Sequence, residues 1–359
     1  MGVKLMHRMA PGAGGWISLP AELLKEVTDH LPATDADQIH IRQVCSHWRA
    51  STAPLAACRP CVVAAYDRHL DFYSAVNPVG EHSLWLPRGG GPRIDALAPA
   101  PANLPYCCGT PRGWLALADD LQSPTRLILW EPLSKAQIPL PTLTTVAQVF
   151  LSGDPLASPA GWMAVASQSA AFHQGRFYIS TMNMSLDIFD LHQQHPKRLR
   201  RICLYAPLQA RYPQFPGNPV PHVVACNNQM LLVMVYHGLG RALVLVEVHR
   251  HRLDWDTDRL DLRGEKMTDL GDYSLFLGRG DSLALSAKDF PAIRRNCVYF
   301  VEHDTRKHEQ WLVVFDLGSN ALKRIPHPHE HTQGGSKTSG WLAYSWFCPR
   351  RPVVEEQAL

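Results

Sequence analysis

Histidines, cysteines and aspartates are the side chains of this chain that could do chemistry. His327, His329 and His331 alternate within the stretch PHPHEH. On a strand, this alternation would place three imidazoles on one face, where they could bind a metal ion. Pro326 and Pro328 favour an extended surface loop instead, because proline is poorly tolerated inside a sheet. We therefore expect no functional metal at this stretch.

The cysteines and aspartates also lack the pattern of a reactive site. Cys58 and Cys61 have CxxC spacing, but the second pair that a structural zinc site needs is missing. Asp269, Asp272 and Asp281 fall close together, and acidic residues at strand ends are ordinary turn formers. No GxSxG, HExxH or GxxxxGK[ST] motif occurs. The sequence therefore predicts no catalytic residue, no metal and no cofactor.

Composition argues against several classes of partner and compartment. The net charge of the 359 residues is only +3, which gives no general attraction to nucleic acid or to an anionic membrane surface. No apolar run reaches the about 18 residues that a membrane-spanning helix needs. Residues 1–14 lack the apolar core of a secretory signal and are expected to be disordered. The odd number of cysteines, nine, fits buried thiols in a reducing compartment, either cytoplasm or nucleus.

The stretch 16–49 differs from everything after it and is typical of two or three short helices. Its apolar residues recur at helical spacing in two stripes. The first stripe consists of Leu23, Leu24, Val27 and Leu31. The second stripe consists of Ile41, Val44, Cys45 and Trp48. Such short helices cannot bury both stripes against each other, since units below about 40 residues rarely hold a core alone. One stripe is therefore expected to contact either the rest of the chain or a second protein.

At these residues the stretch resembles an F-box, with the opening LPAELL and the close RQVCSHWR. The resemblance implies docking on the Skp-type adaptor of a cullin-based (SCF) ubiquitin ligase. Carried over to this chain, the adaptor-binding residues are Leu19, Pro20, Leu23, Leu24, Val27, Leu31, Ile41, Val44, Cys45 and Trp48. The alternative is a helical subdomain that merely packs on the remainder of the chain.

After a linker at 53–60, the pattern changes to short apolar runs between turns. A strand pair recurs four times, and its second strand ends in an acidic residue. These residues are Glu131, Asp190, Glu247 and Asp316. Such repeats without a helical period predict a β-propeller, here of about six or seven blades with one candidate for an incomplete blade. A C-terminal strand from Gly340 would close the ring by pairing with the N-terminal blade. A β-sandwich ranks second, since its sequence would not show this internal repeat.

Two further segments resemble a plant F-box family with a KIB-type β-propeller. They are LGDYSLFLGRGDSLALSAKDFPAIRRNCVYFVEHD, residues 270–304, and PRGWLALAD with LILWEPLSKAQIPLP, residues 111–141. The chain departs from the family between GWMAVAS and SAAFHQGRFYIS, where family members usually carry an extra strand and turn. One blade is therefore expected to be short.

These observations predict a mainly β protein with a short all-α F-box at 15–52, a propeller at 61–348 and a tail at 349–359. The resemblance implies a non-catalytic substrate receptor, in which the F-box binds the Skp-type adaptor and through it a cullin. The propeller would bind a target protein that the sequence does not name. Two alternatives remain open: a β-propeller enzyme or ligand-binding module with a structural helical N-terminus, and an F-box scaffold that acts outside ubiquitination.

Overall fold

The computed structural model describes most of the strands and part of the helical N-terminus. The described residues are 19–30, 41, 44–52, 60–67, 82–85, 101–132, 134–141, 143, 146, 148–157, 159, 161–167, 169–181, 185–190, 197–203, 220–238, 244–251, 266–278, 282–290, 293–304, 309–326 and 340–348. The expected disordered N-terminus at 1–14, nearly all of the linker at 53–60 and the tail at 349–359 lie outside them.

The protein is mainly β, with helices near its N-terminus, as the sequence predicts. Helix α1 spans Ala21–His30 and helix α3 spans Ser46–Ser51. From Cys61 onward the regular structure is almost entirely strand. Among the described residues, no helix has the length and apolar character needed to cross a membrane.

Four of the sheets have four or five strands each. The first consists of β3 (Tyr106–Cys107), β4 (Leu115–Ala118), β5 (Leu127–Trp130) and β6 (Gln137–Leu140). The second consists of β9 (Ser169–His173), β10 (Arg176–Thr181), β11 (Ser185–Asp190) and β12 (Lys197–Cys203). The third consists of β13 (Val220–Cys226), β14 (Gln229–His237), β15 (Val244–His251) and β16 (Lys266–Met267). The fourth consists of β18 (Ser282–Ser286), β17 (Tyr273–Leu277), β19 (Cys297–Asp304), β20 (Glu309–Asp316) and β21 (Ala321–Pro326).

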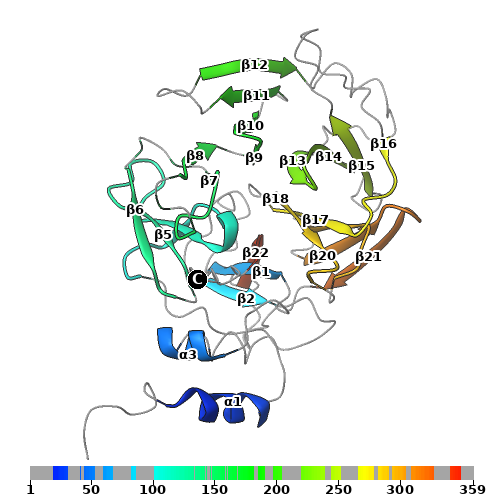
Figure 1. Cartoon of the computed structure of the whole chain (residues 1–359). Coiled ribbons are helices and arrows are strands. Elements are labelled where there is room, and N and C mark those ends of the chain that lie inside the picture. The colour runs from blue at the N-terminus through cyan, green and yellow to red at the C-terminus, as the bar shows by residue number, and fades with distance from the viewer. Residues whose placement is uncertain are drawn as a thin grey trace, which may run out of the picture.

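Two smaller sheets accompany these four. One orders β2 (His82–Trp85), β1 (Cys61–Asp67) and β22 (Gly340–Phe347), and the other pairs β7 (Gln148–Leu151) with β8 (Ala164–Ser167). Figure 1 shows the sheets arranged around a ring, with α1 and α3 beside it. A ring excludes the second-ranked β-sandwich, in which two sheets would stack face to face.

Each of the four larger sheets contains one of the predicted strand pairs. These antiparallel pairs are β4–β5, β10–β11, β14–β15 and β19–β20. The predicted acidic strand ends hold for Asp190 and Asp316, which are the last residues of β11 and β20. Strand β15 instead runs past Glu247, which is buried. Lys266 on β16 lies 2.9 Å from its carboxylate and offsets the buried charge. The four sheets are thus propeller blades built from a repeated unit.

Apolar side chains join neighbouring sheets around the ring. Between the third and fourth sheets, Val246 and Val248 share a core with Val298 and Phe300. Equivalent cores join the first sheet to β7, the β7–β8 pair to the second sheet, and the second sheet to the third. Residues on the two faces of a strand alternate, so each sheet can be apolar toward both neighbours.

Closure of the ring follows the prediction. Strand β22 pairs antiparallel with β1 over the full length of β1, with one irregularity between Val63 and Ala64. Trp346 is fully buried, and its indole N–H donates to the carbonyl of Leu277 at 3.2 Å. On the other side, Thr110 donates to the carbonyl of Trp346 at 2.6 Å. The C-terminal strand is therefore fastened to the sheets on both sides of the closure.

The fourth sheet contains a feature that the sequence did not predict. Strands β17 and β19 are parallel, and β18 adds a fifth strand beyond β17. A parallel neighbour needs a crossover connection, and here the crossover returns at Asn296, which has a left-handed φ of 57°. Asparagine tolerates this conformation better than most residues do.

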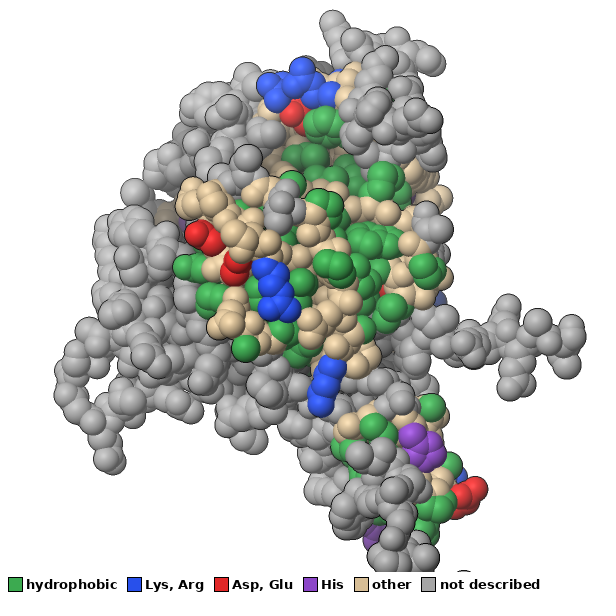
Figure 2. Space-filling view, turned by 90° about the vertical axis from the view of Figure 1, so that its left-hand side faces the viewer, with side chains coloured by type: hydrophobic (Ala, Val, Ile, Leu, Met, Phe, Trp, Pro, Cys, Tyr) green, Lys and Arg blue, Asp and Glu red, His purple; other side chains and the backbone are tan. Residues whose placement is uncertain are grey.

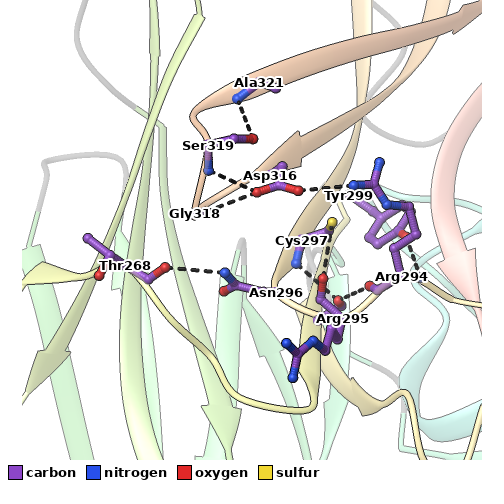
Figure 3. A network of polar contacts seen from close by, with 11 residues as sticks. Thr268, Arg294, Arg295, Asn296, Cys297, Tyr299, Asp316, Gly318, Ser319 and Ala321 are labelled. Carbon is purple, nitrogen blue, oxygen red and sulfur yellow. Dashed lines mark hydrogen bonds and ion pairs between the residues drawn. The ribbon is translucent and has the colours of Figure 1, made fainter.

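Polar contacts fix this crossover, as Figure 3 shows. The side-chain amide of Asn296 donates to the carbonyl of Thr268 at 3.2 Å and accepts from the N–H of Leu270 at 2.9 Å. Arg294 forms an ion pair with Asp316 at 3.0 Å, and its backbone N–H donates to the hydroxyl of Tyr299. The crossover is thus bonded to the strands on both sides of it.

A buried carboxylate also links two blades. Glu302 on β19 accepts from Nε of Arg324 at 2.9 Å, and its other oxygen lies 3.6 Å from Nδ1 of His237 on β14. The second distance is too long for a hydrogen bond, and the contact is an ion pair only when the His237 ring is protonated. Burial acts to raise the pKa of Glu302, but His237 and Arg324 together hold that pKa below its usual value. The charged form is therefore the one that the folded ring favours.

We expect Asn296→Ala to lower the free energy of unfolding by about 3 kcal/mol, from two lost hydrogen bonds and a strained backbone. Urea denaturation measures the loss. Asn320→Ala is the matched control, because Asn320 also has a left-handed φ but is exposed. The control should lose only about 1 kcal/mol, from the backbone alone. An equal loss in both variants would contradict the role of the side-chain amide.

We expect acid to weaken the ring partly through Glu302. Because its pKa is depressed in the folded state, its contribution to stability is present above the pKa of an unfolded glutamate, about 4.3. That contribution is lost as the pH falls through the lower, folded pKa. Glu302→Gln should therefore show a smaller drop in unfolding free energy between pH 6 and acid than the unmodified protein, by urea denaturation. Equal slopes would exclude Glu302 as a source of acid sensitivity.

Candidate functional site

Helix α1 begins directly after Pro20. The N–H of Leu24 donates to the carbonyl of Pro20 at 3.0 Å, which is the first hydrogen bond of the helix. Proline suits this place, since its fixed φ starts a helix and its missing N–H would have no helical partner. Near the end of α1, the ring of His30 lies 2.8 Å from the carbonyl of Glu26. The predicted first helix is thus confirmed.

The predicted second stripe does not lie on one continuous helix. Val44 lies in a bend, and Cys45 has extended dihedral angles (φ −164°, ψ 176°). Helix α3 begins only at Ser46, where the sulfur of Cys45 accepts the N–H of Trp48 at 3.4 Å as an N-cap. The helical spacing therefore runs across a break, which turns Val44 differently from its neighbours in the stripe.

The two stripes meet in a small core of their own. Leu24, Ile41 and Trp48 are buried together, and Leu19 and Cys45 pack against them. The ring of His47 also lies 2.7 Å from the carbonyl of Leu19, which ties α3 to the residue before Pro20. The expectation that the stripes could not bury against each other is therefore wrong for these residues. A break in the second stripe lets part of it turn inward.

Several apolar side chains of this stretch are not buried in that core and stay exposed to solvent. Leu23 is 47% exposed and Val27 is 37% exposed on α1, while Val44 in the bend is 44% exposed. Pro20 is exposed as well. Leu31, which was also predicted to contact the adaptor, lies outside the described residues. We call Leu23, Val27 and Val44 the apolar surface of the F-box stretch.

Some of the residues that might have done chemistry lie within the described part of the chain. Among the described residues, no group of three His, Cys, Asp or Glu could hold a metal ion. Cys61, Cys107 and Cys108 are buried, and burial raises the pKa of the Cys108 thiol well above its usual value. A thiol that resists ionisation is a poor nucleophile. These cysteines are thus packing residues.

The side chains of the described aspartates of this group make local contacts near turns. A carboxylate oxygen of Asp269 accepts the N–H of Gly271 at 2.8 Å, and Asp272 forms an exposed ion pair with Lys288 at 2.6 Å. This agrees with the turn role that the sequence predicts for both. His327, His329, His331, Cys58 and Asp281 lie outside the described residues.

Comparisons with known proteins agree with a helical N-terminal stretch followed by a propeller. The family description F-box domain matches residues 16–52, and the description KIB1-4 beta-propeller matches residues 91–171 and 160–316. No curated protein matches the chain.

Solved structures give only distant similarity. The N-terminal domain of Nup159 is 9% identical with a TM-score of 0.22, and the match covers 66% of this chain and 57% of that chain. The β-propeller domain of Myceliophteria_thermophila Cps50 (Swd1) is 10% identical with a TM-score of 0.25, and the match covers 83% of this chain and 98% of that chain. The chain thus spans little more than half of the Nup159 chain that it matches. By its two family matches, the chain belongs to the F-box proteins that carry a KIB1-4 β-propeller.

Proposed function

We propose that the protein is the substrate receptor of an SCF-type ubiquitin ligase. Its F-box binds a Skp-type adaptor, and through it a cullin, while the propeller binds a target protein. The observation that carries the proposal is the apolar surface of the F-box stretch, formed by Leu23, Val27 and Val44. Two short helices with a filled core of their own have no structural need for this surface.

Burial energetics support a protein partner at this surface. Covering an exposed aliphatic side chain contributes about 1 kcal/mol or more, depending on the apolar area removed from water. Leu23 and Val27 lie one helical turn apart on α1, and with exposed Val44 they can supply the apolar centre of an interface. Leu24, Ile41 and Trp48 would act differently, since they are buried and hold the two helices in position. Leu19 and Cys45, which are half-buried, belong partly to each group.

The proposed mechanism is proximity without a catalytic group in this chain. A receptor that holds a target beside the ubiquitin-charged enzyme converts a bimolecular encounter into a local one and raises the effective concentration. Such a role asks for a rigid body between two binding surfaces, which a closed propeller provides. The cytoplasm or nucleus is the proposed location, on the basis of the odd cysteine count in the sequence.

We also propose that the ring has six blades. Four are the larger sheets, and the β2–β1–β22 and β7–β8 sheets would be reduced blades. Support comes from the cores that join β7–β8 to the sheets before and after it in the chain. The β1–β22 pair likewise shares a core with the fourth sheet and is bonded to Thr110 beside the first.

The test is binding to a purified Skp-type adaptor by isothermal titration calorimetry. We expect the double variant Leu23→Asp, Val44→Asp to weaken binding by about 100-fold or more, since interface anchors contribute about 2 kcal/mol each. Lys25→Glu is the matched control on the same helix. Lys25 is exposed and points away from Leu23, so binding should be unchanged.

Adaptor binding that is absent, or that survives the double variant, would refute the proposed interface. A second measurement, pull-down of a cullin through the adaptor, distinguishes a ligase subunit from a scaffold. Adaptor binding without cullin association would favour the scaffold.

A further inference from the structure

The short sheet β7–β8 ends in a strand whose outer side is exposed. Strand β7 is buried along its whole length, whereas Ala164 and Ala166 of β8 are exposed. In the part of the chain that the structure describes, β8 pairs only with β7. Each of the four larger sheets has at least four strands, two more than the β7–β8 sheet has.

The register identifies which backbone groups of β8 point outward. The N–H of Ser152 donates to the carbonyl of Met163 at 2.9 Å, so these two residues form a hydrogen-bonded pair. In an antiparallel ladder such pairs alternate with non-bonded ones, and Phe150 with Val165 is the next bonded pair. The N–H and C=O groups of Ala164 and Ala166 therefore point away from β7, to the outer edge of β8.

Several contacts hold this edge in place. The N–H of Met163 donates to the hydroxyl of Ser152 at 2.8 Å, which closes the hairpin between β7 and β8. Arg112, in the 3-10 turn Pro111–Gly113 between β3 and β4, donates from Nε to the carbonyl of Leu151 at 3.0 Å and so holds the end of β7. A preformed edge is a good docking site because ordering it costs no free energy on binding.

One neighbouring sheet turns an apolar face toward the outer edge of β8. Ile138 and Leu140 on β6 are in register with Leu129 and Leu127 on β5. Paired residues share a face, and this face belongs to the core that includes Val149 and Leu151 of β7. Ile138 and Leu140 are only half-buried, unlike Leu127 and Leu129.

The sheet on the other side turns a basic face toward the same edge. Arg201 and Arg198 on β12 are in register with Asp187 and Phe189 on β11. Asp187 shares its face with Ile179, which packs on β8 through Val165. Both arginines are exposed, and Phe189 is half-buried.

This basic face keeps a net positive charge. Asp187 forms a bidentate ion pair with Arg201, with both N–O distances at 2.7 Å, and so offsets one of the two charges. Figure 2 faces this side of the molecule and shows hydrophobic side chains below a group of Lys and Arg side chains at the top, where β12 lies in Figure 1.

We propose that an extended acidic segment of the target protein adds to β8 as a third strand. A strand is the occupant that can pair with a row of outward N–H and C=O groups. Its side chains would alternate between the two flanking faces. Those on the side of Ile138 and Leu140 would be apolar, and those on the side of Arg198 and Arg201 would be acidic. The proposal rests on the proposed function, because it names what the receptor captures.

The test uses the full chain, with and without the adaptor, and a short, capped, fluorescein-labelled peptide that alternates valine and glutamate. Fluorescence anisotropy should show binding that weakens with added salt, as expected for charge pairing. A peptide that alternates valine and lysine should bind at least tenfold more weakly. Arg198→Glu should reverse this preference.

Strand addition itself is tested by Ala166→Pro, which removes an outward N–H. Proline is tolerated where the N–H faces away from the ladder, so the sheet should persist. We expect at least tenfold weaker peptide binding, with Ala166→Ser, which keeps the N–H, as the matched control. A peptide with N-methyl groups on alternate residues removes the same kind of hydrogen bond without changing the protein. It should also bind at least tenfold more weakly.

Several results would overturn the proposal: equal binding of the two peptides, no loss with Ala166→Pro or the N-methylated peptide, or no binding of the valine–glutamate peptide at all. Self-association that Ala166→Pro abolishes would also overturn it, because a second copy would then be the occupant. Adaptor binding is measured separately through the F-box. Peptide binding without adaptor binding would refute the proposed ligase role and leave the edge site intact.

Discussion

The pairing of β22 with β1 is the contact on which the remaining organisation depends. It joins residues 61–67 to residues 340–347, which are far apart in the chain, so the sheet that closes the ring needs both segments. The loop entropy of such a distant pairing is substantial, and burial of Trp346 against Phe276 and Tyr299 helps to offset it. Once closed, each sheet buries its apolar faces between neighbours, and the ring needs no helix to cover it.

This closure explains why the N-terminal helices keep an apolar surface. Their own core uses Leu24, Ile41 and Trp48, and the ring has already buried its faces internally. Leu23, Val27 and Val44 stay exposed, and in the proposed function they contact the adaptor. The short sheet is an exception: among the described strands β8 pairs only with β7, and Ile138 and Leu140 of the neighbouring sheet stay half-buried.

The sequence predicted the features that depend on local pattern. The four strand pairs were predicted because the same short apolar runs repeat along the chain, and the closing strand was predicted because pairing with the N-terminal blade would remove exposed edges. The parallel arrangement of β17 and β19 was missed, since it depends on a crossover at Asn296 that no local period encodes. The break before α3 was missed because Ile41, Val44, Cys45 and Trp48 keep helical spacing across it.

The sequence likewise predicted only those parts of the candidate sites that depend on a local pattern. Spacing alone could nominate the apolar residues of the F-box stretch, but only packing separates the buried Leu24 from the exposed Leu23 beside it. The outer edge of β8 could not be nominated by its residues, because AVAS carries no chemistry of its own. It is a candidate site because of its surroundings. The backbone groups of Ala164 and Ala166 point outward, half-buried Ile138 and Leu140 lie on one side, and Arg198 lies on the other. In our proposal, the site exists because β8 pairs only with β7 among the described strands, and the two flanking sheets determine which side chains the ligand carries.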